Sequence, residues 1–303
     1  MKIHNMELSK KESFLTNAFL KTPIFMTTRS NEFIETEYNM FNYNVQISGK
    51  QLNNDKDLDL FLWLVQQNKK TIVVAWKDIL TDLGIINKDR RINKDRKNML
   101  IKSVSKLMGT NINIKGKDME LNCSGGGFSL ISDYEFDNDN IKIRVSDKLI
   151  ELYAQEKFKK VIKLDDLENL SQNDRSLYLF ICSYRKREVY IRLDKLKVRF
   201  APDKLNKDYT KQLKISLNNL EAAGKIGCSY ITKQNVLYIN KKSLTQADCK
   251  KMCEEHAKEN GGTTGKYEDV DTYEADEKIR LKQVAVKNAE LIRQKEIEDS
   301  IPF

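Results

Sequence analysis

Lysine side chains recur at helical spacing in the second half of this chain. Lys207, Lys211 and Lys214 are separated by four and then three residues, so a helix would place them on one face. Ammonium groups aligned in this way can bind a row of phosphates. Tyr209 and Thr210 lie beside them, where they could touch a phosphate or a thymine methyl. The alternative is a solvated helix face without a ligand.

A second basic cluster lies in the first half of the chain. Its candidate DNA contacts are Arg90, Arg91, Lys94, Arg96, Lys97 and Lys102. Guanidinium groups can bind phosphates or guanine edges, whereas ammonium groups act mainly on phosphates. A later polar turn carries two further candidates, Lys233 and Gln234, for which an ordinary solvated turn is an equal alternative.

The two basic segments are copies of one pattern. Residues 93–107 and 206–220 are identical at six of fifteen aligned positions, and each runs from a polar start into an apolar stripe. The stretch before each copy predicts a helix, a short strand and a short helix. The stretch after each copy predicts a β-hairpin, at 110–123 in the first and 225–240 in the second. This is the order of a winged helix, whose last helix can lie in the major groove, so we expect two such modules.

The predicted fold class is α+β, with two tandem winged-helix domains, extra β-strands in the first domain and a helical or disordered C-terminal tail. The extra strands are expected at 128–136 and 140–145, where in the second stretch apolar and charged residues alternate. The predicted divisions are an N-terminal arm with a short helix at 1–40, the first domain at 41–164, the second at 165–243 and the tail at 244–303.

Charge is distributed unevenly along the chain, whose formal net charge is +9. Residues 244–303 carry 10 basic and 14 acidic side chains, whereas residues 1–243 carry 43 basic and 30 acidic ones. A basic body favours a polyanionic partner, because each cation near a phosphate can release condensed counterions. A lysine-rich solvated surface is the alternative interpretation of this charge taken alone.

Enzymatic and metal chemistry find little support in the sequence. The two histidines, His4 and His256, lie near the ends, so neither a Ser-His-Asp triad nor a paired-histidine metal site is indicated. Cys249, Cys253 and His256 lack a nearby fourth zinc ligand, and the glycine-rich segment 124–127 lacks the Lys-Ser/Thr of a phosphate loop. We therefore expect no enzymatic activity, no catalytic residue, no bound metal and no cofactor.

The predicted cellular location depends on two further features that the sequence lacks. No apolar run reaches the roughly 18 residues of a membrane span, and the N-terminus lacks the apolar core of a signal peptide. The five cysteines are an odd number, which favours reduced thiols. We expect a bacterial cytoplasmic protein without a membrane partner.

Two segments resemble iteron-binding plasmid replication initiators of the TrfA, RepA and RepE type. Gly49-Lys50-Gln51-Leu52, followed by 57–61, is similar to the opening of their first module, and the segment from Leu177 to Gly224 is similar to their second. The resemblance covers roughly residues 40–242. The chain departs from the family in its second recognition helix, where lysines replace a run of arginines, which bears on base reading more than on phosphate contact.

The resemblance implies a function and a set of partners. Such proteins bind repeated sites (iterons) in double-stranded origin DNA, promote opening of the origin, and recruit the host initiator and the replicative helicase. The resemblance also implies a dimer formed through the first module, which represses the protein's own gene. The binding energy bends and untwists DNA, and no covalent step is needed. A winged-helix transcriptional regulator and a winged-helix protein-interaction scaffold are the alternatives.

Overall fold

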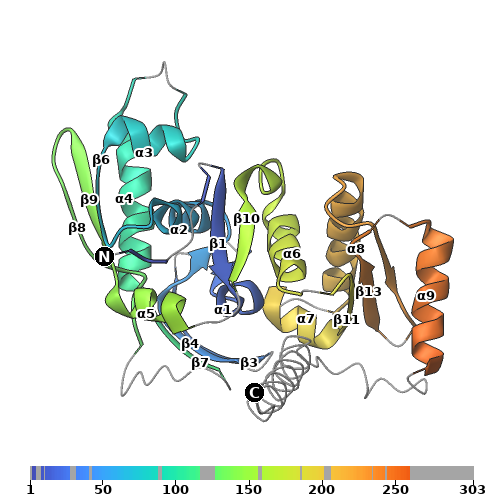
Figure 1. The fold of residues 1–303 in the computed structure, drawn as a ribbon. Coiled ribbons are helices and arrows are strands. Elements are labelled where there is room, and N and C mark those ends of the chain that lie inside the picture. Colours follow the sequence, from blue (N-terminus) through green and yellow to red (C-terminus); the bar gives the residue numbers. More distant parts are fainter. Residues whose placement is uncertain are drawn as a thin grey trace, which may run out of the picture.

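The fold was analysed in a computed structural model of the chain (Figure 1). The structure describes residues 2–4, 8–9, 11–27, 32–40, 43–87, 91–116, 127–155, 159–184, 186–200, 206–233, 235–242 and 244–259.

The second half of the chain forms a module of three helices and one small sheet. Its elements are α6 (Gln172–Cys182), β11 (Glu188–Arg192), α7 (Leu193–Phe200), α8 (Asn206–Ala222), β12 (Cys228–Ile231) and β13 (Val236–Asn240). The strands are antiparallel in the order β11-β13-β12. Apolar residues of all three helices and of the strands share one core, to which α8 contributes Leu213, Leu217 and Leu220. The element order is the one that the sequence predicts.

The first half of the chain contains the same arrangement. Its elements are α2 (Lys56–Gln67), β6 (Thr71–Ala75), α3 (Trp76–Asp82), α4 (Lys94–Gly109), β8 (Ile131–Phe136) and β9 (Asn140–Val145). The sheet order is β6-β9-β8, in which each strand takes the place of its counterpart in β11-β13-β12. The repeat in the sequence is therefore a repeat in three dimensions.

The first arm of the hairpin predicted at 110–123 belongs to a different sheet, and its second arm lies outside the described residues. β7 (Asn111–Gly116) pairs with β4 (Tyr43–Lys50), which pairs with β3 (Phe33–Met40) in a separate sheet, and residues 117–126 lie outside the described residues. The strands predicted as extras, β8 and β9, form the hairpin instead. Alternating apolar residues show that β7 is a strand with one buried face, but they do not identify its partner.

The segment predicted as an N-terminal arm contributes to the core instead. β1 (Glu12–Thr16) pairs with β10 (Lys159–Lys163) and is followed by α1 (Asn17–Lys21). Phe14, Ala18 and Leu20 of this segment are completely buried. Figure 1 shows β1 and β10 between the two modules. A polar composition with scattered aromatics conceals this role, since few apolar residues suffice for one short strand and one turn of helix.

The remaining elements support the two modules. They are β2 (Phe25–Met26), β5 (Leu52–Asn53), α5 (Asp147–Gln155), η1 (Leu164–Asp166) and α9 (Gln246–Glu259). β2 and β5 pair in parallel, whereas α9 packs against β12 through a small cluster that contains Cys228, Cys249 and Cys253. In the described part of the chain, no helix has the length and hydropathy needed to cross a membrane.

The six positions that are identical in the two copies fall into two groups. Three of the six identical pairs are buried in the cores, namely Leu100 and Leu213, Ser103 and Ser216, and Leu107 and Leu220. The other three pairs form the polar start of each helix. In α4, the Asn93 side chain accepts a hydrogen bond from the Arg96 N–H at 2.9 Å, which caps the helix.

Gly49 allows β4 to approach the end of α4. Its φ is +139°, a region that side chains rarely adopt. A Cβ atom at this position would lie 2.7 Å from both the Gly109 carbonyl oxygen and the Thr110 Cα atom. The neighbouring Thr110 Oγ1 donates a hydrogen bond to the Lys50 carbonyl at 2.6 Å, so this contact region admits little movement.

We expect Gly49→Ala to lower the free energy of unfolding by about 2–5 kcal/mol, because the new Cβ adds backbone strain and overlaps backbone atoms. Gly84→Ala is the matched control, since Gly84 also has positive φ (+64°) but nothing within 4 Å of an added Cβ. Its expected cost is only about 1 kcal/mol, from the left-handed backbone. Urea denaturation of both variants measures the difference, and equal costs would contradict this account of Gly49.

Candidate nucleic-acid interface

The outer face of α8 carries a stripe of exposed lysines. Lys207, Lys211 and Lys214 are all exposed. On the opposite face Leu213 and Leu217 are buried in the core. The structure therefore brings these three predicted contacts together on one solvent-facing surface, because the core occupies the other side of the helix.

Tyr209 does not belong to this surface, so its prediction as an exposed contact is wrong. The residue is 5% exposed and packs in the core beside Leu213 and Phe200. It precedes Leu213 by four residues and so extends the apolar stripe by one turn. Its hydroxyl has no hydrogen-bond partner among the described residues, and burial raises the pKa of Tyr209. Thr210, the next residue, is half-buried.

Sequence reasoning missed two members of the exposed α8 face. Ile215 is 52% exposed although it is apolar, and Asn218 is exposed as well. Ile215 follows Lys211 by four residues and Asn218 follows Ile215 by three, so they continue the lysine stripe along the helix. That spacing was the available signal, and a search restricted to charged residues does not detect it.

The outer face of α4 is arranged in the same way. Lys94, Asn98 and Lys102 are exposed and are each four residues apart. Arg91 is exposed immediately before the helix, whereas Arg90 lies outside the described residues. Lys94 is the counterpart of Lys207 in the aligned repeat. The first module thus offers two lysines and an arginine to solvent near the start of its last helix.

Arg96 and Lys97 lie nearer the core than the other predicted contacts in α4. Both are half-buried. Lys97 Nζ donates a hydrogen bond to the Asn138 carbonyl at 2.6 Å and lies 5.0 Å from the centroid of the Trp76 ring. Asn138 belongs to the turn between β8 and β9. The ammonium group of Lys97 therefore holds the hairpin turn of the first module against α4 and α3.

The hairpin turns of the two modules differ in charge. Asp137 accepts hydrogen bonds from the backbone N–H groups of Asn140 and Asp139 at 2.7 and 2.8 Å, and these bonds lower its pKa. The first turn is therefore anionic and repels phosphate. The second turn presents exposed Lys233 instead, and Gln234 lies outside the described residues.

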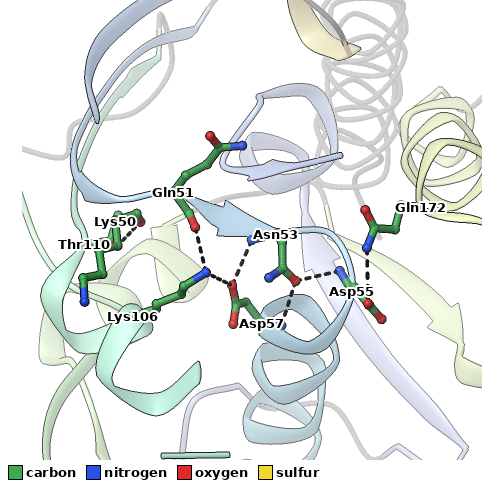
Figure 2. A network of polar contacts seen from close by, with 8 residues as sticks. All are labelled: Lys50, Gln51, Asn53, Asp55, Asp57, Lys106, Thr110 and Gln172. Atoms are coloured by element: carbon green, nitrogen blue, oxygen red, sulfur yellow. Dashed lines mark hydrogen bonds and ion pairs between the residues drawn. The ribbon is translucent and has the colours of Figure 1, made fainter. Parts of the chain in front are cut away.

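A buried carboxylate connects α2 to α4 (Figure 2). The Asp57 side chain is 2% exposed and accepts a hydrogen bond from the Asn53 N–H at 2.9 Å. Lys106 Nζ, near the end of α4, lies 3.6 Å from Asp57 Oδ2 and donates to the Gln51 carbonyl at 3.4 Å. This network includes Gln51 of the Gly49–Leu52 segment and fixes the end of α4 to the start of α2.

The same region contacts the second module. Gln172 Nε2, in the first turn of α6, donates to Asp55 Oδ2 at 3.2 Å, and Asn54 Nδ2 donates to the Gln172 carbonyl at 3.0 Å. Arg175 forms an ion pair with Asp59 at 2.7 Å. Burial raises the pKa of Asp59, and the Arg175 guanidinium opposes that effect. These contacts link the starts of α2 and α6, the first helices of the two modules.

Within the described ranges the structure shows no candidate metal site. No three His, Cys, Asp or Glu side chains there gather closely enough to hold a metal ion. Cys249 and Cys253 are buried against Cys228 and Tyr238. α4 and α8 each present exposed lysines on their outer faces.

Two solved structures are among those similar to this chain. One is a crystal structure of domains 2 and 3 of RctB, 10% identical, covering 76% of this chain and 99% of that chain with a TM-score of 0.49. A second structure of the same RctB domains is 14% identical and covers 75% and 96%, with a TM-score of 0.46. No family model and no curated protein matches the sequence. Similarity at this level does not assign the chain to a family.

We expect Lys97→Met to lower the free energy of unfolding by about 1 kcal/mol, because it removes the hydrogen bond to the hairpin turn and the contact with Trp76. Lys102→Met deletes the same charge from the exposed face, so it should change stability by less than about 0.5 kcal/mol. Urea denaturation of both variants gives the comparison. Equal stability of the two would show that Lys97 does not hold the hairpin.

Proposed function

We propose that this chain binds double-stranded DNA through two winged-helix modules, with α4 and α8 as recognition helices. The observation that carries the proposal is the exposed lysine stripe on α8, the last helix of a helix-strand-helix-helix-hairpin unit. The same unit occurs a second time, with Lys94 and Lys102 on the equivalent face of α4. In a winged helix this is the helix that enters the major groove.

The two modules support a contact that spans more than one turn of DNA. Two recognition helices on one chain would occupy successive major grooves, separated by about 34 Å along the duplex. The contacts between Asp55 and Gln172 and between Asp59 and Arg175 support a defined spacing between the modules. A repeated site of about two helical turns is the target that this arrangement fits best.

We propose further that the bound DNA is a replication origin with repeated sites and that the protein initiates plasmid replication there. The resemblance of the Gly49–Leu52 segment and of residues 177–224 to iteron-binding initiators supports this role. Gly49 and its neighbours lie at the end of α4, beside the network that reaches the second module. Dimerisation through the first module, gene repression, and recruitment of the host initiator and helicase remain predictions from that resemblance.

Charge reversal on α8 tests the DNA-binding proposal. We expect the double variant Lys207→Glu/Lys211→Glu to lose specific binding to a duplex selected by the wild-type protein from a random library. Its residual binding should depend less on salt, with the slope of log affinity against log salt reduced by about 2. Fluorescence anisotropy at several salt concentrations provides both quantities.

The matched control is Lys250→Glu/Lys251→Glu, which makes the same charge change on exposed residues of α9. This variant should bind close to the wild-type level. Equal losses in the two double variants would indicate a general effect of net charge. Unchanged binding by the α8 variant would contradict the assignment of α8 as a recognition helix.

Replication of a reporter plasmid distinguishes an initiator from a transcriptional regulator. A plasmid that carries the DNA flanking the gene should replicate only when this protein is supplied, and that DNA should contain tandem repeats of about 20 base pairs. A single palindromic operator without replication activity would favour the regulator.

A further inference from the structure

One exposed apolar side chain follows the lysine stripe of α8. Ile215 is 52% exposed, while its neighbours Leu213, Ser216 and Leu217 are 5%, 4% and 2% exposed. The core of the module is therefore complete without Ile215. Its aligned counterpart in α4 is Lys102, so the two copies differ at this point of the outer face.

A lone exposed isoleucine is common on protein surfaces and needs no explanation by itself. The position of Ile215 is what distinguishes it, because the surrounding outer residues are all able to contact nucleic acid. Lys211 lies one turn before it, Lys214 is adjacent, and Asn218 lies almost one turn after it. If the lysines bind phosphates, the exposed side chains that follow them on the same face of α8 are placed to reach the base edges in the groove.

From this placement we infer that α8 reads A·T base pairs, with Ile215 contacting the C5 methyl group of a thymine and Asn218 hydrogen-bonding to an adenine. The inference rests on the proposed function and names the module that reads the sequence. The thymine methyl is the apolar group that the major groove presents, and an asparagine side chain can pair with adenine N6 and N7.

The spacing along the helix fits two reading positions. Ile215 and Asn218 are separated by three residues, which is about 4.5 Å along the helix axis. Consecutive base pairs are separated by about 3.4 Å along the duplex, so a helix lying in the groove brings the two side chains to neighbouring base pairs. Lys207, Lys211 and Lys214, which precede both side chains along the helix, remain available for phosphates.

The outer face of α4 has a different composition. Lys94 and Lys102 are positively charged, and the face holds one exposed asparagine, Asn98, with no exposed isoleucine at the position of Ile215. The adjoining hairpin turn is anionic at Asp137. We therefore assign discrimination of A·T pairs chiefly to the second module.

Base analogues that lack a single functional group test this inference with the full chain. A duplex selected by the wild-type protein is resynthesised with each thymine replaced in turn by deoxyuridine, which lacks only the C5 methyl group. We expect wild-type affinity to fall about fourfold at one or two positions, the loss that corresponds to one buried methyl group. The Ile215→Ala variant should bind the thymine and deoxyuridine duplexes equally at those positions.

Asn218 is tested with a second base analogue. Replacing adenine by 7-deazaadenine removes the N7 acceptor, and wild-type affinity should fall roughly fivefold or more at the position that Asn218 reads. Asn218→Ala should be insensitive to the same replacement. A double-mutant cycle between protein and DNA changes isolates each pair.

Val73→Ala is the matched control, because Val73 is 66% exposed and lies on β6, outside both recognition helices. It should retain the wild-type preference for thymine over deoxyuridine. Thermal melting of all three variants shows that they are folded.

The outcomes separate this inference from the proposed function. If no thymine responds in the wild type, or if Ile215→Ala keeps the wild-type response, the inference is wrong, although selective DNA binding still stands. If the wild-type protein selects no sequence from the library, the proposed function fails first and the inference fails with it.

Discussion

The buried carboxylate of Asp57 is the charged group that holds α2 and α4 together. With 2% of its side chain exposed, it has lost nearly all of its water and depends on Lys106 and the Asn53 N–H for compensation. Removing one partner from a buried ion pair typically costs about 3–5 kcal/mol. The pair joins the first turn of α2 to the last part of α4, and the adjoining loop contacts α6 through Gln172. The placement of α4 therefore depends on this buried network, and the adjoining loop connects the network to the first helix of the second module.

The two modules share one architecture and have diverged on their surfaces. Buried positions such as Leu100 and Leu213 are constrained by packing, so they remain alike. Outer positions are free of that constraint, and the hairpin turns now carry opposite charges at Asp137 and Lys233. Duplication of a module followed by such divergence gives one chain two non-equivalent surfaces.

Sequence patterns predicted the elements better than their partners. The helices and the module order follow from local signals, such as the cap at Asn93 and the apolar spacing of Leu213, Leu217 and Leu220. β7 was assigned to the wrong sheet because strand alternation contains no information about a partner some 70 residues away. At the candidate interface the lysines were predicted, Tyr209 was placed on the wrong face, and Ile215 was missed because an exposed apolar residue resembles a core residue in sequence.

The pairing of β1 with β10 has a consequence for synthesis of the protein on the ribosome. Strand Glu12–Thr16 is made before its partner Lys159–Lys163, which follows only after nearly 150 further residues. At an elongation rate of about 5–20 residues per second, β1 waits on the order of ten seconds for that partner. During this interval the apolar side chains of Phe14 and Leu15 are not yet covered by β10. The first module thus completes its core only as the second begins to emerge, which couples the folding of the two in time.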